Sequence, residues 1–418
     1  MIKDRLLVAI LAATTLVGAC TTSSTKSINP ISDQQTTYFA DPEERELFDE
    51  SERLHDEFVR KGLIYRDSAL TRYINKVSTD IQPQIIKEKF ELRFFVMRDP
   101  SVNAFALPNG NIYLNIGLLN RLDNESQLAF VMAHEAAHII NRHAFKSKVS
   151  RRNDIVGAHI ADFFLAGTGL SYLAAVSNIA SYSRDLETEA DERALVFLST
   201  TDYDLSKVVD TFDQLKEVKH NKDSTSIWAS HPDALTRKKS ATTYIETHGL
   251  PSHSNTVDSE TFQKFKAELT EATLKMRLRL RQYQLAQETA EAAILHQGEN
   301  ALIHAYIGDS YRLRLENQLT AAQERAWLYD EKTEIAKQYI DDNLVIFEQQ
   351  ANTHYQLALQ LSADNANAVR GTGLLLSYQG KTSEAIDYLD RYLSFEKIPD
   401  RRFIEMKVKQ LHTTNNEK

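Results

Sequence analysis

Two histidines and a glutamate in the first third of the chain have the spacing of a metal site that performs hydrolysis. His134 and His138 are separated by one helical turn, so both imidazoles can reach one Zn²⁺ from the same face of a helix. Glu135 lies between them and points toward the open side of the metal, where it can act as a base. The spacing therefore predicts zinc-assisted hydrolysis.

The residues around this motif favour a buried helix. Residues 130–133 precede the motif and Ile139 and Ile140 follow it, so the segment is apolar on most sides. The alternative is an ordinary amphipathic helix with surface histidines, which would show a polar face. Two buried imidazoles beside a buried carboxylate need a partner that offsets their desolvation, and a metal ion provides one.

The zinc also needs a third protein ligand, because a catalytic zinc binds three side chains and keeps one position open. We expect this ligand to be Glu187. Asp191 lies one helical turn further on the same face, where it can accept a hydrogen bond from the outer N–H of a ligand histidine. Glu189 is the nearest competing ligand, although it points to another side of the helix. A solvated acidic helix face is the alternative for the whole segment.

Length and composition indicate a globular protein with two domains. The chain has 418 residues, which exceeds the size at which one hydrophobic core keeps growing. Charged residues make up 26% of it, and only 13 Gly and 8 Pro are present, which excludes collagenous and low-complexity proteins and favours a helix-rich one. The net charge of −9 argues against nucleic acid as a partner.

The N-terminus has the pattern of an export signal. Two basic residues precede an apolar run that ends before Cys20, which is the only cysteine, and residues 1–19 are the expected signal peptide. Residues 17–20 resemble the lipobox of bacterial lipoproteins, which implies a lipidated Cys20 that anchors the protein to a membrane. Thr21 lacks the aspartate that commonly retains lipoproteins at the inner membrane, so we expect the periplasmic side of the outer membrane. An incidental cysteine behind an ordinary export signal is the alternative.

The rest of the chain divides where its composition changes. Residues 20–40 are polar and form the expected flexible tether. Residues 41–250 are the expected zinc metallopeptidase domain. Alternating apolar residues in segments 91–97, 103–107 and 111–116 predict a small antiparallel sheet that leads into the zinc helix.

Three further segments of this domain are informative. A cap, a proline and two acids predict a helix start at residues 41–44, and a second helix is predicted over residues 68–81. Residues 155–180 are apolar but are interrupted by His159 and Asp162. This pattern suits a mobile flap or a contact with a membrane surface better than a transmembrane span.

Residues 259–413 are predicted to form a helical repeat domain. Residues 367–393 have small and large residues at the positions of a tetratricopeptide helix pair. The positions are Gly373, Gly380, Ala385 and Leu389. A generic helical bundle is the alternative. Stacked helix pairs form a concave surface that binds proteins.

An earlier pair is expected in the same domain. Residues 301–314 resemble the first helix of a repeat, and residues 349–358 its second helix. A charged insertion over residues 315–345 separates the two. Residues 285–295 resemble the second helix of a still earlier pair. The predicted fold is therefore mostly α (α+β), with a zincin-like domain followed by tetratricopeptide-like helices.

Taken together, these motifs resemble the gluzincin metallopeptidases, which include the prenyl-protein endopeptidases and the bacterial heat-shock membrane proteases. Besides the zinc helix, four motifs of that family are matched. They are Asn-Ala-Phe at residues 103–105, Gly-Leu-Leu at residues 117–119, the downstream His143, and Glu-x-x-Ala-Asp at residues 187–191. The resemblance covers about residues 41–246, and the added repeats resemble the members that work in Gram-negative envelopes.

In that group a histidine and an arginine six residues apart approach the zinc, and His231 and Arg237 match this spacing. The resemblance implies that Arg237 supports the site. His231 has two interpretations: it donates to the oxyanion as the tetrahedral intermediate forms, or it fills the open zinc position and holds the enzyme shut. A loop histidine that caps a helix before Pro232 is the remaining alternative.

The predicted reaction is hydrolysis of peptide bonds with one Zn²⁺ per subunit, in which Glu135 takes a proton from water and returns it to the leaving amine. We expect substrate to bind as an extended strand against an exposed sheet edge. That edge is predicted to consist of Asn111, Ile112, Tyr113, Leu114 and Asn115. Such binding suits unfolded or misassembled envelope proteins.

The repeats are expected to dock substrate or the outer-membrane assembly machinery. The main alternative is a chaperone or scaffold that acts through its repeats while His231 keeps the zinc site closed. A prenyl-type processing enzyme inside a membrane is weaker, because no transmembrane spans are predicted.

Overall fold

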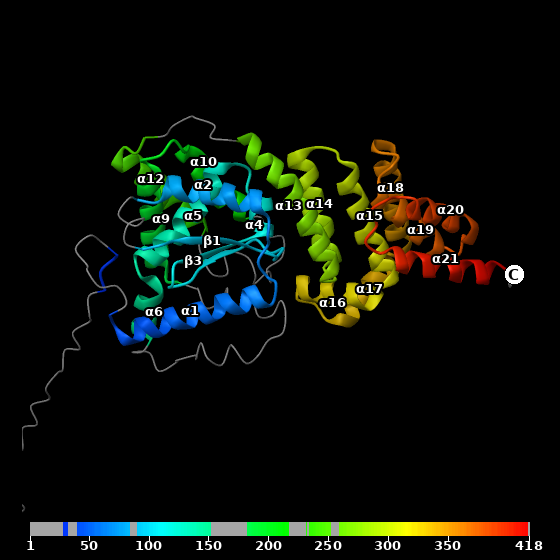
Figure 1. Cartoon of the computed structure of the whole chain (residues 1–418), viewed down its shortest axis with the longest axis horizontal. Helices are drawn as coiled ribbons and strands as arrows, with labels where there is room; N and C mark the ends of the chain where they lie inside the picture. Colours follow the sequence, from blue (N-terminus) through cyan, green and yellow to red (C-terminus); the bar gives the residue numbers. More distant parts are fainter. Residues whose placement is uncertain are drawn as a thin grey trace, which may run out of the picture.

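The computed structural model describes residues 28–31, 40–83, 90–151, 182–216, 231, 234–251 and 259–416. A layered N-terminal domain is followed by an array of helices that extends to the C-terminus (Figure 1). The predicted signal peptide with Cys20 and the apolar segment 155–180 lie outside the described residues. None of the described helices is long and apolar enough to cross a membrane.

A three-stranded sheet lies at the centre of the N-terminal domain, with the strand order β1-β3-β2. The strands are β1 (Arg93–Met97), β2 (Ala104–Ala106) and β3 (Asn111–Asn115). β3 pairs antiparallel with β2 but parallel with β1. The prediction of an antiparallel sheet was therefore wrong for β1. The chain crosses from β1 to the far edge before the hairpin turn at Gly110, so β3 enters between the other two strands.

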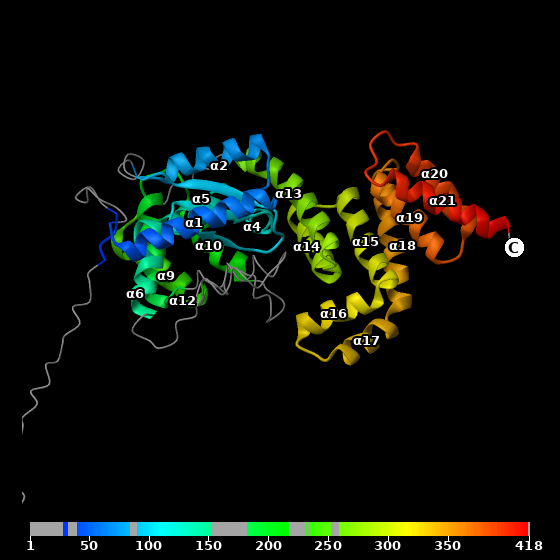
Figure 2. The same cartoon turned by 60° about the horizontal axis from the view of Figure 1, so that its bottom comes forward.

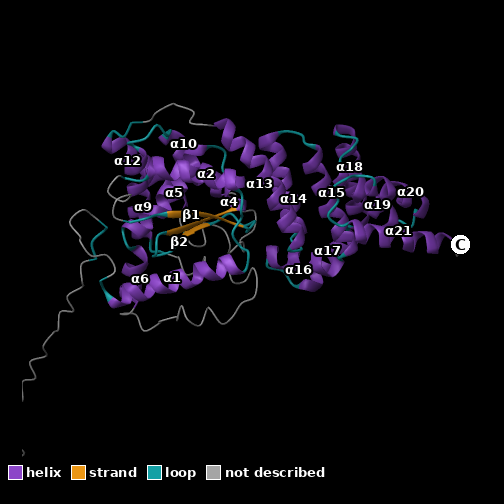
Figure 3. Ribbon diagram, viewed as in Figure 1, coloured by secondary structure: helices purple, strands orange, loops and turns teal. Residues whose placement is uncertain are grey.

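Alternate residues of these strands face two different helical layers. Phe105 and Tyr113 pack with Phe58 of α1 (Pro42–Arg60) on one face. Ile112 and Leu114 belong to the core on the other face, which α2 (Ser68–Ile81) and α5 (Glu125–Ile140) cover. Figure 3 shows α1 on one side of the orange strands and α2 and α5 on the other. The predicted starts of α1 and α2 are confirmed.

Helix α5 is buried along its whole length, as its apolar composition predicted. The side chain of Asn124 caps its first turn by accepting from the N–H of Gln127. The helix ends at Ile140 with Asn141 as its C-cap, and Arg142 then adopts a left-handed conformation with a φ of 57°. This conformation turns the chain sharply, so that His143 at the start of the next helix folds back toward α5.

Shorter helices complete the N-terminal domain around α5. They are α4 (Ile116–Arg121), α6 (His143–Arg151), α9 (Arg184–Leu198), α10 (Leu205–Lys216) and α12 (Ala234–His248). Ile31 also belongs to this core, where it is buried and its N–H donates to the carbonyl of Ile140 at 2.8 Å. This part of the predicted flexible tether is therefore packed against the domain.

The C-terminal array is entirely helical in its described part. It consists of α13 (Ser259–Arg279), α14 (Tyr283–Gln297), α15 (Ala301–Glu316), α16 (Gln318–Tyr329), α17 (Thr333–Asp342), α18 (Leu344–Leu361), α19 (Ala366–Tyr378), α20 (Thr382–Leu393) and α21 (Arg401–Asn416). Helix α13 joins the two parts, because Phe262 and Leu269 lie in the N-terminal core whereas Leu274 packs with Ala290 of α14.

The displaced helix pair predicted from the sequence is confirmed, since α15 and α18 pack against each other along their length. The charged insertion between them forms α16 and α17, which lie to one side of the array (Figure 2). Tyr355 of α18 is buried between Gly308 and Gly371. A Cβ at Gly371 would lie 2.2 Å from the Tyr355 ring, so the three helices meet only because these positions carry no side chain.

We expect Gly371→Ala to destabilise the helical array by about 1–3 kcal/mol, because the added methyl overpacks the Tyr355 ring. The loss should appear as a lower thermal unfolding temperature. In an open helix the same change is stabilising, so helix propensity predicts the opposite sign. Thr372→Ala, at the next position, is the matched control. An unchanged or higher unfolding temperature for Gly371→Ala would contradict the packing argument.

Candidate metal centre

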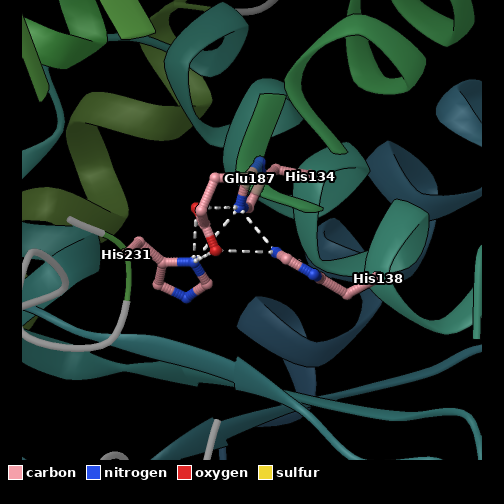
Figure 4. A group of neighbouring side chains, drawn as sticks. All are labelled: His134, His138, Glu187 and His231. Carbon is pink, nitrogen blue, oxygen red and sulfur yellow. Dashed lines mark hydrogen bonds and ion pairs between the residues drawn. The ribbon is translucent and has the colours of Figure 1, made fainter. Parts of the chain in front are cut away.

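Four buried side chains bring their ligand atoms to one place (Figure 4). The side chains are His134 and His138 of α5, Glu187 of α9, and His231, and their ligand atoms all lie within 4.8 Å of one another. The Nε2 atoms of His134 and His138 are 2.9 Å apart, and each lies 3.6 Å from a Glu187 oxygen. Ligands around a tetrahedral zinc are separated by about 3.3 Å. The spacing of these atoms fits one zinc ion.

The outer nitrogens of the two α5 histidines are held by other side chains. Asp191 Oδ1 accepts from His134 Nδ1 at 2.9 Å, which leaves a lone pair on the inner nitrogen of His134. His138 Nδ1 lies 2.8 Å from His143 Nδ1, and donating to it leaves the inner nitrogen of His138 bare as well. Two bare nitrogens and the Glu187 carboxylate would repel one another unless a cation lay between them.

The charges around this point also favour a divalent cation. Glu135, Glu187 and Asp191 are buried, and among the described residues Arg237 is the permanent cation that pairs with Glu187 and Asp191. Arg237 binds both oxygens of Asp191, at 2.7 and 2.8 Å, and an oxygen of Glu187 at 2.9 Å. One guanidinium does not balance a group of three buried carboxyls, and Zn²⁺ would add positive charge at this point.

The pKa shifts follow from these contacts. Burial alone would raise the pKa of Asp191, but Arg237 and His134 hold it well below its usual range. The pKa of Glu187 is also lowered, because the effect of His231 and Arg237 outweighs that of burial. Burial raises the pKa of Glu135, whose Oε1 has no hydrogen-bond partner within the described part of the chain. Of the three buried carboxyls, Glu135 is therefore the one whose pKa is raised, which brings it closer to the pKa of an effective general base.

His231 points its Nδ1 into the ligand group. This atom lies 2.9 and 3.0 Å from the two oxygens of Glu187 and 3.3 Å from His134 Nε2. The other ring nitrogen is 3.4 Å from Glu135, and Arg237 donates to the His231 carbonyl at 3.2 Å. Of the two expected interpretations, this geometry matches the one in which His231 fills the open metal position. Pro232 lies outside the described residues.

Two neighbours of His138 had no role in the sequence prediction. Tyr182 stacks on the His138 ring with a centroid distance of 4.1 Å, and its place just before α9 was the only signal for it. His143 was matched only as part of a family motif. Its contact with His138 depends on the left-handed turn at Arg142, which residue spacing does not reveal. Burial lowers the pKa of His143 to about 4.

The competing ligand Glu189 lies outside the ligand group. Its carboxylate is partly exposed, and it contacts His143 Nε2 at 3.3 Å and Lys146 Nζ at 3.1 Å. Glu189 therefore faces a different side of α9 from Glu187, as its position in the helix indicated.

The predicted substrate-binding edge was wrong. The strand that contains Asn111 to Asn115 is β3, which is buried and paired on both sides, so it offers no free edge. The sequence could not reveal this, because every strand of a small sheet alternates alike whether it is central or at an edge. Residues 63–65 cover part of the outer edge of β1. The open edge among the described strands is that of β2.

Comparison with known proteins identifies this arrangement. Residues 66–245 match the model of peptidase family M48, and this match contains all four ligand residues. Residues 66–245 are a family M48 peptidase domain. Because M48 peptidases use zinc, the one-metal site of this M48 domain is assigned to zinc.

The chain is also similar in sequence to several named proteases. The chain is 27% identical over 198 residues to the beta-barrel assembly-enhancing protease of Escherichia coli K12, which covers 43% of this chain and 40% of the relative. A putative protease of the same name from Vibrio cholerae is 28% identical over 166 residues, covering 37% and 34%. The mitochondrial metalloendopeptidase OMA1 of Schizosaccharomyces pombe is 29% identical over 170 residues, covering 40% and 50%. The matched part thus spans from about a third to half of these relatives.

We expect Glu187→Ala to lower the zinc affinity of the purified protein by more than about tenfold, because a ligand and its charge are lost. Zinc content after competition with a chelator measures the effect. Glu189→Ala is the matched control, two residues away on the same helix, and should retain zinc. Equal zinc content in the Glu187 variant and the parent protein would refute the ligand assignment.

Proposed function

We propose that the protein is a lipid-anchored periplasmic zinc metalloendopeptidase that cleaves unfolded or misassembled envelope proteins, including those of the outer membrane. The observation that carries this proposal is the buried ligand group of the M48 domain, with Glu135 beside it. The names of the bacterial relatives support an envelope substrate. The sequence around Cys20, which lies outside the described residues, supports the anchor.

The reaction we propose is hydrolysis of a peptide bond. Zinc held by His134, His138 and Glu187 would supply a Lewis acid that polarises the scissile carbonyl and acidifies a water. The Oε1 atom of Glu135 lies beside the ligand group and accepts no hydrogen bond within the described part of the chain, so it can take a proton. Because burial raises its pKa, Glu135 can hold this proton and deliver it to the leaving nitrogen.

The substrate is proposed to bind along β2. The register with β3 directs the backbone groups of Ala104 and Ala106 away from β3, toward the open edge. The N–H of Ala104 is taken by the side chain of Asn103, whereas Ala106 has no backbone partner within the described residues. Ala106 and the zinc ligand His138 line one hollow. A strand added here would pass the metal and would be recognised through its main chain.

The position of His231 supports a controlled enzyme. Its Nδ1 occupies the fourth corner of the ligand group, so a substrate or water has to displace it. The same observation favours the second candidate function, a chaperone or scaffold that works through its helical repeats with the zinc site closed. In the peptidase function His231 moves out of the fourth metal position, whereas in the scaffold function it stays there.

We expect Glu135→Gln to lower the rate of cleavage of an unfolded protein such as reduced casein by about 10²–10⁴-fold, because the general base is lost. Zinc content should be unchanged, since Glu135 is not a ligand. His231→Ala should raise the rate by opening the metal. If neither the parent nor the His231 variant cleaves the substrate while both contain zinc, the scaffold function is correct and the peptidase proposal fails.

A further inference from the structure

A second hollow lies in the helical array, apart from the zinc ligands. It has a volume of about 430 Å³ and is lined by α14, α15, α16, α17 and α18. The α16–α17 pair, which is the charged insertion of the sequence, contributes part of its lining. Figure 2 shows this pair below α14 and α15. A cavity of this size holds a few residues of a peptide.

Arg314 is a buried cation in the wall of this cavity. Its side chain is only 7% exposed, and its guanidinium bonds to the amide oxygen of Gln287 at 2.6 Å. Its Nε has no hydrogen-bond partner, and no carboxylate of the described residues lies within 4 Å. Arg312 of the same helix differs, because Asp309 and Glu316 each pair with it at 2.8 Å. Burial lowers the pKa of Arg314. An unpaired buried guanidinium is costly for folding.

A second arginine, Arg325 of α16, lines the same cavity, and aromatic rings flank both arginines. The rings are Tyr311 and Phe347 near Arg314, at 5.1 and 5.4 Å, and Tyr329 and Tyr339 near Arg325, at 4.4 and 3.6 Å. Arg325 Nε already pairs with Glu331 Oε1 at 2.8 Å, so the terminal nitrogens of Arg325 are the ones left to bind a ligand. Rings hold the face of a guanidinium and leave its N–H edges free of ring contact. Those edges suit the planar geometry of a carboxylate.

The acids of the cavity are engaged elsewhere. Glu324 accepts from the backbone N–H of Gln284 at 2.9 Å, so it caps α14 and does not pair with Arg314. Glu288 and Glu291 lie on α14, and each accepts from a glutamine four residues earlier in that helix. The cavity thus has one wall with arginines and one wall with carboxylates. A ligand that carries a carboxylate at one end and N–H or basic groups further along fits both walls.

We propose that this cavity binds an extended peptide through a carboxylate that contacts Arg314 and Arg325, while N–H groups of the peptide face Glu288 and Glu291. The carboxylate can be the C-terminus of a protein or an Asp or Glu side chain. This site goes beyond the peptidase function and does not depend on it, because none of its residues belongs to the zinc centre.

The test measures peptide binding to the full chain carrying Glu135→Gln, so that no cleavage interferes. The probes are fluorescein-labelled octapeptides of Gly and Ser that end in Phe. One has a free C-terminal carboxylate, one a C-terminal amide, and one the amide with an added internal Glu. We expect the first to bind and Arg314→Met to weaken it by at least about tenfold, because a charge-assisted pair is lost. Binding should also fall as salt is added.

Arg391→Met is the matched control, because Arg391 lies on α20, outside the cavity lining, and its guanidinium donates to the Ala363 carbonyl and to Asp364. It should bind the peptide like the parent. Arg314→Met should also keep its thermal unfolding temperature, since it removes a buried charge that has no counter-charge. The partly exposed Arg325→Met gives a second test should the Arg314 variant unfold.

The outcomes separate the two carboxylate sources. Binding of the free acid alone identifies a C-terminus, and binding of the amide only when it contains Glu identifies an acidic side chain. Equal binding of all three peptides, no binding of any of them, or binding that neither arginine variant weakens would overturn the proposal. None of these results bears on the peptidase activity, which the zinc-site variants test separately.

Discussion

Charge compensation inside the N-terminal domain is the constraint on which the rest of the structure depends. Three carboxylates and the ligand histidines are buried together, and Arg237 alone cannot neutralise the acids. A metal ion would complete the charge balance of this group, and partners on the outer atoms of its ligands hold them in place. Helices α5, α9 and α12 each contribute to this group, so their packing and the zinc centre depend on each other.

The same network fixes the position of His231. Arg237 contacts Asp191 and Glu187 through its side chain and also donates to the backbone of His231. One residue therefore links the ligand carboxylate, the partner of His134 and the residue in the fourth position. The hydrogen bond from Arg237 to the His231 carbonyl therefore connects α12 directly to the ligand group.

Helix α13 connects this centre to the helical array. One of its faces completes the N-terminal core, and the other begins the stack of helices. Thr270 and Arg277 of α13 add hydrogen bonds to Asn120 and to the carbonyl of Pro100. The two parts share a helix instead of a free linker, so the array holds a fixed orientation to the M48 domain. A peptide bound in the array would therefore be presented from a defined direction.

The sequence by itself determined the local features. The spacing of His134, Glu135 and His138 and the apolar residues around them predicted a buried metal helix, and the small and large residues of α15, α18, α19 and α20 predicted the helix pairs. Both features depend on the spacing of residues within single helices, and that spacing can be read directly from the sequence.

Only the tertiary structure decided which strand is central in the sheet and which side chains contact the histidine nitrogens of the metal centre. The alternation of β3 resembles that of an edge strand, and its place between β1 and β2 follows from how the chain crosses the sheet. The contact of His143 with His138 needs the turn at Arg142, and the isolation of Arg314 needs the positions of five helices. These properties are relations between residues distant in sequence, and they exist only once the segments are packed together.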